Sequence, residues 1–338
     1  MPEFTVVAAL GGSSRSVVER VRAGDRTLVV KRFTGDPGGF PREAAALSVL
    51  PPEAPAPRLV EVREAPPAIV MSDEGSGPSV ADLLLGSDPA AAREGVLSWA
   101  SAVARLHDVS VGLGEAFRAA LASRSAQPVS TAADEVAEAI EVLSSFAGEL
   151  AVEVPGGAWE ELRGLVARLA TGPAVLSPDD TCPDNNVATP RGRVLLDFEN
   201  AQWRHPAWDV AYLVVPWPTC WCAWRLPAEV AEQAIGRYRE ESALAWAASP
   251  DFRPDIEAAA TVWAFETTAM FLSRALGDDP PLPDPAKKMP ARRALLLHRL
   301  AAAGHHRPGS ALSALAANFR ETLTARWGEI PLPYAPAF

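Results

Sequence analysis

The chain has 338 residues, about twice the length of an ordinary domain, which favours two lobes or subdomains. Its composition, 48% hydrophobic and 22% charged, is typical of a folded protein and excludes a disordered one. With 31 basic and 42 acidic residues the net charge is −11, which argues against nucleic acid or an anionic membrane as partner, since both attract positive surfaces.

Three features favour a cytoplasmic location. Cys182, Cys220 and Cys222 are too few for a disulfide framework, and one is left over in any pairing. The N-terminal sequence MPEFTVVAAL lacks the basic and apolar regions of a secretion signal. No apolar run approaches the roughly 18 residues that would suggest a membrane span.

The N-terminal part of the chain is rich in short β-branched segments separated by turn residues, which predicts a meander of strands interrupted by one helix. Strands are expected over Phe4–Leu10, Ser16–Arg22, Thr27–Phe33, Arg58–Arg63 and Ala68–Met71, and the helix over Pro41–Leu50.

Alanine- and leucine-rich stretches with helical spacing follow a glycine-, serine- and acid-rich segment at 73–78. Helices are expected over Ser79–Leu85, Pro89–Leu106, Gly114–Ala122, Thr131–Leu150 and Ala158–Ala170, then from Ala207 to about Trp327, with a loop and one strand, Val194–Leu196, between the two sets. The prediction is an α+β protein with a small β-rich N-terminal lobe (1–72), a linker (73–78) and a larger helical lobe (79–338).

Residue types suited to phosphoryl transfer gather between positions 174 and 213. Asn185 follows Asp180 by five residues, and a short apolar strand then ends in Asp197-Phe198-Glu199. In transfer from a magnesium nucleotide, one carboxylate orients the attacking hydroxyl, while a neutral oxygen ligand and a second carboxylate hold the metal. We expect Asp180, Asn185 and Asp197 to converge.

The N-terminal lobe supplies candidates for phosphate binding. Lys31, one of only three lysines, ends an alternating strand, and Glu43 follows on the single helix of that lobe. A strand lysine paired with a helix glutamate is the arrangement that holds nucleotide phosphates in kinases. The turn Gly11-Gly12-Ser13-Ser14 lies between two expected strands, where glycine lets backbone amides approach phosphates closely.

These features, in this order, resemble the aminoglycoside phosphotransferase and choline kinase family, which has the two-lobed protein-kinase-like fold. The resemblance is carried by Val29–Lys31, Glu43, Arg105-Leu106-His107 and the segment 177–213, where D-x-x-x-x-N, DFE and WDVAYL follow one another. The family usually has histidine two residues before the catalytic aspartate. Here Pro178 takes that place, which bears on how the loop is held more than on its chemistry.

The resemblance implies a role for each matching residue. Asp180 would be the catalytic base, Asn185 and Asp197 the magnesium ligands, and Lys31 with Glu43 the phosphate clamp. Asp209 would brace the loop that carries Asp180. The hinge Met71–Glu74, which includes Asp73, would contact adenine through its backbone. Asp179 and Asp184 have the same spacing as Asp180 and Asn185, and Asn186 adjoins Asn185. Only Asp180 with Asn185, however, satisfies the full D-x-x-x-x-N pattern.

Other clusters have plainer interpretations. The C-x-C pair at 220–222 and Cys182 lack a fourth zinc ligand of convincing spacing, His205 being only a candidate, so buried thiols are expected. Five of the ten tryptophans, at 203, 208, 217, 221 and 224, form either an aromatic wall for an acceptor or, as we favour, helical core.

The resemblance implies an enzyme that uses ATP or GTP and Mg²⁺ to phosphorylate a hydroxyl group of a small molecule. A second hypothesis changes the acceptor to a peptide or a secondary-metabolite intermediate, and an apolar channel lined by Trp217 and Trp221 would favour it. A third is a catalytically silent kinase-like binding or regulatory protein, which Pro178 and the incomplete glycine motif would favour. The acceptor and the oligomeric state are left open.

Overall fold

A five-stranded antiparallel sheet forms the N-terminal part of the structure, which is a computed structural model describing residues 4–12, 15–34, 38–125, 130–279 and 287–338. Its strand order is β1-β2-β3-β5-β4, and one helix, α1 (Gly39–Val49), covers one face. The strands are β1 (Thr5–Gly12), β2 (Ser16–Ala23), β3 (Arg26–Phe33), β4 (Leu59–Glu64) and β5 (Pro67–Ser72). The expected meander is confirmed.

The alternation of β3 decides where Lys31 points. Successive strand residues face opposite sides of a sheet. Val29 and Phe33 belong to the main hydrophobic core with α1, whereas Leu28 and Val30 belong to a separate small cluster on the other face. Lys31 therefore shares the α1 face, at the centre of the sheet between Val18 of β2 and Ile69 of β5.

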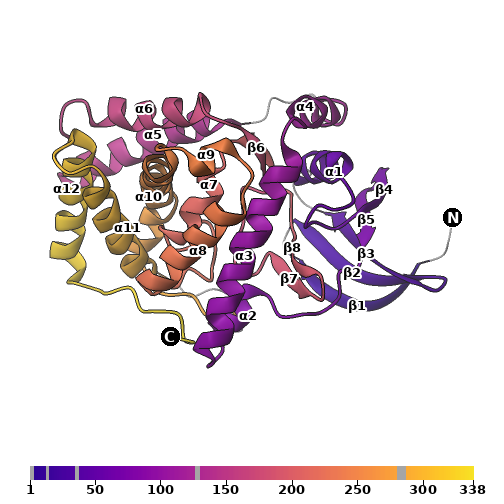
Figure 1. Cartoon of the computed structure of the whole chain (residues 1–338). Coiled ribbons are helices and arrows are strands. Elements are labelled where there is room, and N and C mark those ends of the chain that lie inside the picture. Colours follow the sequence, from indigo (N-terminus) through magenta and orange to yellow (C-terminus); the bar gives the residue numbers. More distant parts are fainter. Residues whose placement is uncertain (1–3, 13–14, 35–37, 126–129, 280–286) are drawn as a thin grey trace.

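The rest of the chain is mostly helical, as expected. The 22-residue helix α3 runs between the sheet and most of the later helices, whereas α4 lies beside α1 at the sheet end (Figure 1). The 25-residue helix α10 is buried among the later helices. The helices are α2 (Val80–Leu84), α3 (Pro89–Ser110), α4 (Gly114–Ala122), α5 (Ala132–Leu150), α6 (Ala158–Ala170), α7 (Ala207–Val210), the 3₁₀ turn η1 (Ala211–Leu213), α8 (Ala228–Glu241), α9 (Ala245–Ala248), α10 (Phe252–Leu276), α11 (Arg292–His306) and α12 (Ala311–Trp327). None of the described helices combines the length and apolar character needed to cross a bilayer.

Two short strand pairs come between α6 and α7 in the chain. They are β6 (Val175–Ser177) with β9 (Gln202–Arg204), and β7 (Asn186–Thr189) with β8 (Gly192–Leu195). Of these four strands only β8 was expected, since such short segments rarely show a period in the sequence. The expected helical run after 207 is also broken, since 214–227 carries no helix in the structure.

The linker at 73–78 and the C-terminal tail both pack closely against other parts of the chain. The linker before α2 passes so close to β7 that a Cβ atom on Gly77 would lie 2.0 Å from the carbonyl oxygen of Ala188. The extended C-terminal tail packs back on the body, where the Ala337 N–H donates to the Leu84 carbonyl and the Ala335 N–H to that of Arg225.

Candidate active site

Lys31 is the centre of a buried charge cluster. Its Nζ lies 2.7 Å from Glu43 Oε2 on α1 and 2.5 Å from Asp197 Oδ1. Glu199 Oε2 lies 2.9 Å from the same nitrogen. Asp197 and Glu199 come from the turn after β8, so residues far apart in sequence meet here. Lys31 faces three carboxylates, and Arg15 Nη2 pairs with Glu199 Oε1 at 2.7 Å, so two cations meet three carboxylates.

Burial and charge act in opposite directions on the Lys31–Glu43 pair, whose side chains are 5% and 2% exposed. Burial by itself lowers the pKa of Lys31, but the surrounding carboxylates outweigh it and hold that pKa above its ordinary value. Burial raises the pKa of Glu43 to about 7 against the attraction of Lys31. Each charge lowers the cost of burying the other.

Asp180 and Asn185 face each other across the loop at 178–185, between β6 and β7, which is the expected catalytic loop. The Asn185 Nδ2 group donates to the Asp180 carbonyl oxygen at 2.9 Å and to its Oδ2 at 3.2 Å. The Asn185 carbonyl accepts from the N–H of Leu196 at 2.9 Å. This bond holds the loop beside the chain just before Asp197, so the three expected residues approach one another.

The Asp180 carboxylate has two further donors, which no sequence motif predicts. Its Oδ1 accepts from the Thr219 hydroxyl at 2.5 Å and from the Cys182 thiol at 2.8 Å. Burial raises the pKa of Asp180 to about 6, and these two hydrogen bonds oppose that rise. The carboxylate is therefore mostly ionised at neutral pH and able to accept a proton.

The neighbouring residues that form the alternative register have other partners. Asn186 is buried and donates to the carbonyls of Cys182 and Pro183, while its own oxygen accepts from Val80 N–H. The Asp184 carboxylate accepts from the Trp221 indole at 2.5 Å. The geometry favours the pairing of Asp180 with Asn185.

A second buried charge cluster holds the loop from behind. Asp209 is fully buried and accepts from His107 Nε2 at 2.9 Å, from the Ser177 hydroxyl at 2.7 Å and from Arg204 Nη2 at 3.1 Å. Burial alone raises the pKa of Asp209, but the hydrogen bond from His107 and the charge of Arg204 bring it below its ordinary value. Arg204 also forms an ion pair with Asp179. The loop is thus braced without a histidine in the position that Pro178 occupies.

The expected nucleotide contacts lie around the Lys31 face. Gly11 and Gly12 end β1 and pair with Val18 and Val17, whereas Ser13 and Ser14 lie outside the described residues.

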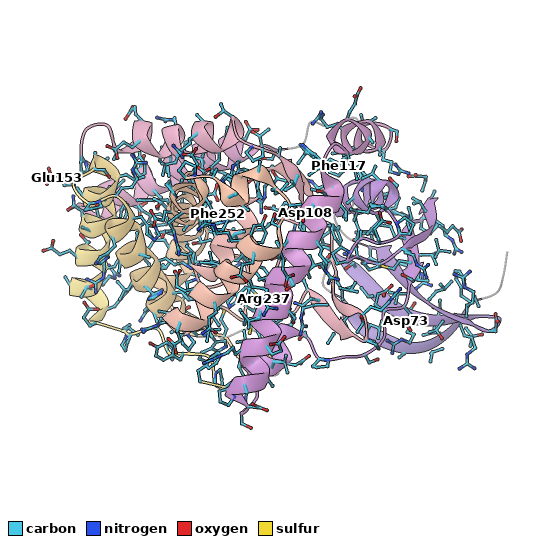
Figure 2. All side chains as sticks on the ribbon, viewed as in Figure 1. Asp73, Asp108, Phe117, Glu153, Arg237 and Phe252 are labelled. Carbon is cyan, nitrogen blue, oxygen red and sulfur yellow. The ribbon has the colours of Figure 1, made fainter. Side chains whose placement is uncertain are left out.

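Met71 lies in β5, and the linker follows directly. The carboxylate of Asp73, labelled at the edge of the sheet in Figure 2, accepts two hydrogen bonds from Arg20 and one from Gly75 N–H. Its side chain orders the linker.

Of the five tryptophans, Trp208 and Trp217 belong to the core, whereas Trp203, Trp221 and Trp224 are half-buried against it. Trp208 and Trp217 are 3% and 0% exposed, and Trp217 packs edge-on against Trp99 at 5.3 Å. Trp217 therefore does not line an open channel, whereas Trp221 is half-buried at the surface. Cys182, Cys220 and Cys222 are buried free thiols, as expected.

Two adjoining cavities flank the DFE turn. The smaller, about 270 Å³, is lined by charged residues including Glu199, Asp179 and Glu135. The larger, about 850 Å³, is mostly apolar and extends under Phe117, labelled on α4 in Figure 2. Asp180 is not among the described residues that line either one. Its carboxylate faces the side formed by Thr219, Cys182 and Asn185.

Comparison with solved structures finds the same fold in several small-molecule kinases. The chain superposes on a choline/ethanolamine kinase family protein from Mesorhizobium loti with a TM-score of 0.53, at 20% identity over 93% of this chain and 92% of that one. The ethanolamine kinase of Plasmodium vivax gives a TM-score of 0.51, at 13% identity over 96% and 81% of the two chains. Choline kinase LicA from Streptococcus pneumoniae gives 0.50, at 14% identity over 93% and 94%. The two-lobed kinase-like α+β fold is confirmed.

Comparison with curated protein sequences gave no match. The model of the phosphotransferase enzyme family, in contrast, matches residues 5–248, which span the sheet, the Lys31 cluster, the catalytic loop and the DFE turn. The chain belongs to the phosphotransferase enzyme family.

Proposed function

We propose that this phosphotransferase moves the terminal phosphoryl group of a magnesium nucleotide, ATP or GTP, to a hydroxyl group of a small molecule. The observation that carries the proposal is the convergence of two sets of residues. Lys31 and Glu43 meet Asp197 from one side, and the Asn185–Leu196 hydrogen bond brings the Asp180 loop to the same turn.

The residues present fit Mg²⁺. The Lys31 cluster has one more carboxylate than cations, because Arg15 also pairs with Glu199. The ligand atoms of Glu43, Asp197 and Glu199 all lie within 4.8 Å of one another. Hard oxygen donors of this kind are the ligands that Mg²⁺ prefers. Asp197 and Asn185 would hold the ion, which when bound would neutralise charge on the phosphate oxygens.

The side chains divide the remaining work between binding and orientation. Lys31 would hold the non-transferred phosphates, while its ion pair with Glu43 keeps the ammonium group in place. Asp180 would orient the acceptor hydroxyl and take up its proton. The Gly11–Gly12 turn and the backbone of Met71–Glu74 would contact the nucleotide. Such an enzyme contributes positioning and charge rather than covalent chemistry.

A catalytically silent nucleotide-binding protein is the second candidate, and one observation favours it. Both carboxylate oxygens of Asp180 already accept hydrogen bonds within the protein, two at Oδ1 and one at Oδ2. Against it, the protein keeps Lys31, Asp180, Asn185 and Asp197 together, and a silent protein has no physical need for all four.

Thermal unfolding with MgATP, MgGTP and EDTA tests nucleotide binding. A ligand at a hundredfold excess over its dissociation constant stabilises the folded state by about 2.7 kcal/mol. We expect a magnesium-dependent rise in Tm for the wild type that is lost in Asp197→Asn. No rise with either nucleotide would contradict the proposal.

Transfer of labelled γ-phosphate to a panel of alcohols then separates the two candidates. Choline, ethanolamine and streptomycin are suitable first members, because structures of the fold are described as choline and ethanolamine kinases and as a streptomycin–ATP complex. Asp180→Ala should keep the nucleotide-dependent rise in Tm and lose transfer by about 100-fold or more. Full turnover in that variant would remove Asp180 from the mechanism.

A cytoplasmic location goes with the proposal, since ATP and free thiols coexist there.

A further inference from the structure

Two thiols and a carboxylate meet beside the catalytic loop. The Sγ atoms of Cys182 and Cys220 and a carboxylate oxygen of Asp184 all lie within 4.8 Å of one another. The Cys220 Sγ lies 3.3 Å from Asp184 Oδ1. Around a tetrahedral zinc ion, with Zn–S near 2.3 Å and Zn–O near 2.0–2.2 Å, neighbouring sulfur and oxygen ligands are about 3.5–3.8 Å apart. The three groups need little movement to share one ion.

The surroundings support these three groups as ligands. The Trp221 indole donates to Asp184 Oδ2 and so orients the carboxylate, and the Cys222 N–H donates to Cys220 Sγ at 3.2 Å. Hydrogen bonds of this kind hold metal ligands in position. Both thiols are buried, whereas Asp184 is only half-buried, which gives an ion a way in from its side.

We propose that Cys182, Asp184 and Cys220 form a site for a thiophilic divalent ion such as Zn²⁺, separate from the magnesium ligands, and that its occupation inhibits phosphoryl transfer. Thiolate ligands select Zn²⁺ over Mg²⁺, which prefers oxygen. Binding replaces the two thiol protons, which leave to solvent, while Asp184 binds as the carboxylate. The fourth position is left for water or for Asp180.

Inhibition follows from the position of Cys182. Its thiol now donates to Asp180 Oδ1 at 2.8 Å, and it loses that proton when it binds the ion. The dication then sits beside the carboxylate that would accept the acceptor's proton, and it lowers the basicity of that carboxylate or binds it outright. This consequence rests on the proposed function, whereas binding of the ion does not.

Binding is measured on reduced, metal-free full-length protein by titrating Zn²⁺ against a chromophoric chelator, and by the thiolate-to-metal absorption of Co²⁺ substituted for zinc. We expect one ion per chain, with affinity reduced by about 100-fold or more in Cys220→Ser and in Asp184→Asn. Cys222→Ser is the matched control, because it removes a buried thiol from the same segment outside the cluster. It should bind as the wild type does.

Equal affinity in the wild type and Cys220→Ser, or a Co²⁺ spectrum without thiolate absorption, would overturn the inference. Under phosphotransfer conditions, one equivalent of Zn²⁺ should slow the wild type at least tenfold and leave the residual rate of Cys220→Ser unaffected; inhibition of both would overturn the regulatory part. Absence of transfer with every acceptor, with zinc binding intact, would count against the proposed function alone.

Discussion

Two buried charge clusters flank the loop that carries Asp180, and they differ in exposure and in how their carboxylates are hydrogen-bonded. Around Lys31, one ammonium group meets the carboxylates of Glu43, Asp197 and Glu199. Around Asp209, the guanidinium of Arg204 and the imidazole of His107 satisfy a carboxylate with no exposed surface, and Arg204 also pairs with Asp179. Arg15 also pairs with Glu199, so the first cluster has one carboxylate more than cations, and its Asp197 side chain is 36% exposed.

The difference suggests that the Lys31 cluster binds a ligand, whereas the Asp209 cluster holds the loop in place. Unmatched buried charge is costly unless something else pairs with it, and a divalent cation with nucleotide phosphates would do so here. In the second cluster, donors within the protein satisfy both oxygens of Asp209, so it has no such need and contributes a fixed loop geometry. We therefore expect substitutions in the Asp209 cluster to act on stability and those in the Lys31 cluster to act on activity.

Asp209→Ala should have the largest effect on folding. Removing it leaves the buried Arg204 charge with less compensation and two donors without a partner, so the free energy of unfolding should fall by about 3–5 kcal/mol. Urea unfolding measures this. Asp251→Ala is the control, because it also breaks a carboxylate–arginine pair, but an exposed one with Arg168, and should cost about 1 kcal/mol or less. Similar losses in both variants would refute the distinction.

Lys31→Met should instead act mainly on turnover. It keeps the length of the side chain and removes the charge that would hold the phosphates, so kcat/KM should fall by about 100- to 1000-fold. The assay is transfer from labelled nucleotide to whichever acceptor is accepted. Lys287→Met removes a surface lysine and should leave kcat/KM unchanged. A Lys31 variant that loses stability but keeps its rate would reassign this cluster to structure.

Glu135 lies on α5 near Asp179, at the edge of the Asp209 cluster. Substituting it should have a smaller, pH-dependent effect on stability. Burial, and then the charge of Asp179, raise the pKa of Glu135 to about 7. The folded state therefore binds this proton more tightly than the unfolded state, and the resulting stabilisation is lost as pH rises from about 4.5 through 7. Glu135→Gln should be more stable than the wild type by about 1–2 kcal/mol at pH 8, and the two should converge near pH 4.

Unfolding curves of both proteins across this pH range give the comparison. Glu138→Gln, an exposed position on the same helix, should show no such difference. A Glu135→Gln difference that does not change with pH would show that the carboxyl group has an ordinary pKa.

Local pattern in the sequence was enough to predict much of this protein. The alternation of Leu28–Lys31 indicated that Lys31 projects toward the cleft or core, and the structure brings its side chain against Glu43. The strands of the sheet and most of the long helices also followed from period and turn residues, since these signals act within a few residues. The spacing of Asp180, Asn185 and Asp197 likewise pointed to one loop and one turn.

Contacts between distant segments were decided by the tertiary structure alone. Thr219 bonds Asp180 from 39 positions away, and Asp184 meets Cys220 from 36, across a segment that was expected to be helical. Arg204 joins Asp179 and Asp209 from the three-residue strand β9, which shows no pattern of its own. Sequence periodicity reports the environment of a residue's own element, whereas these pairs exist only because separate elements pack into one core.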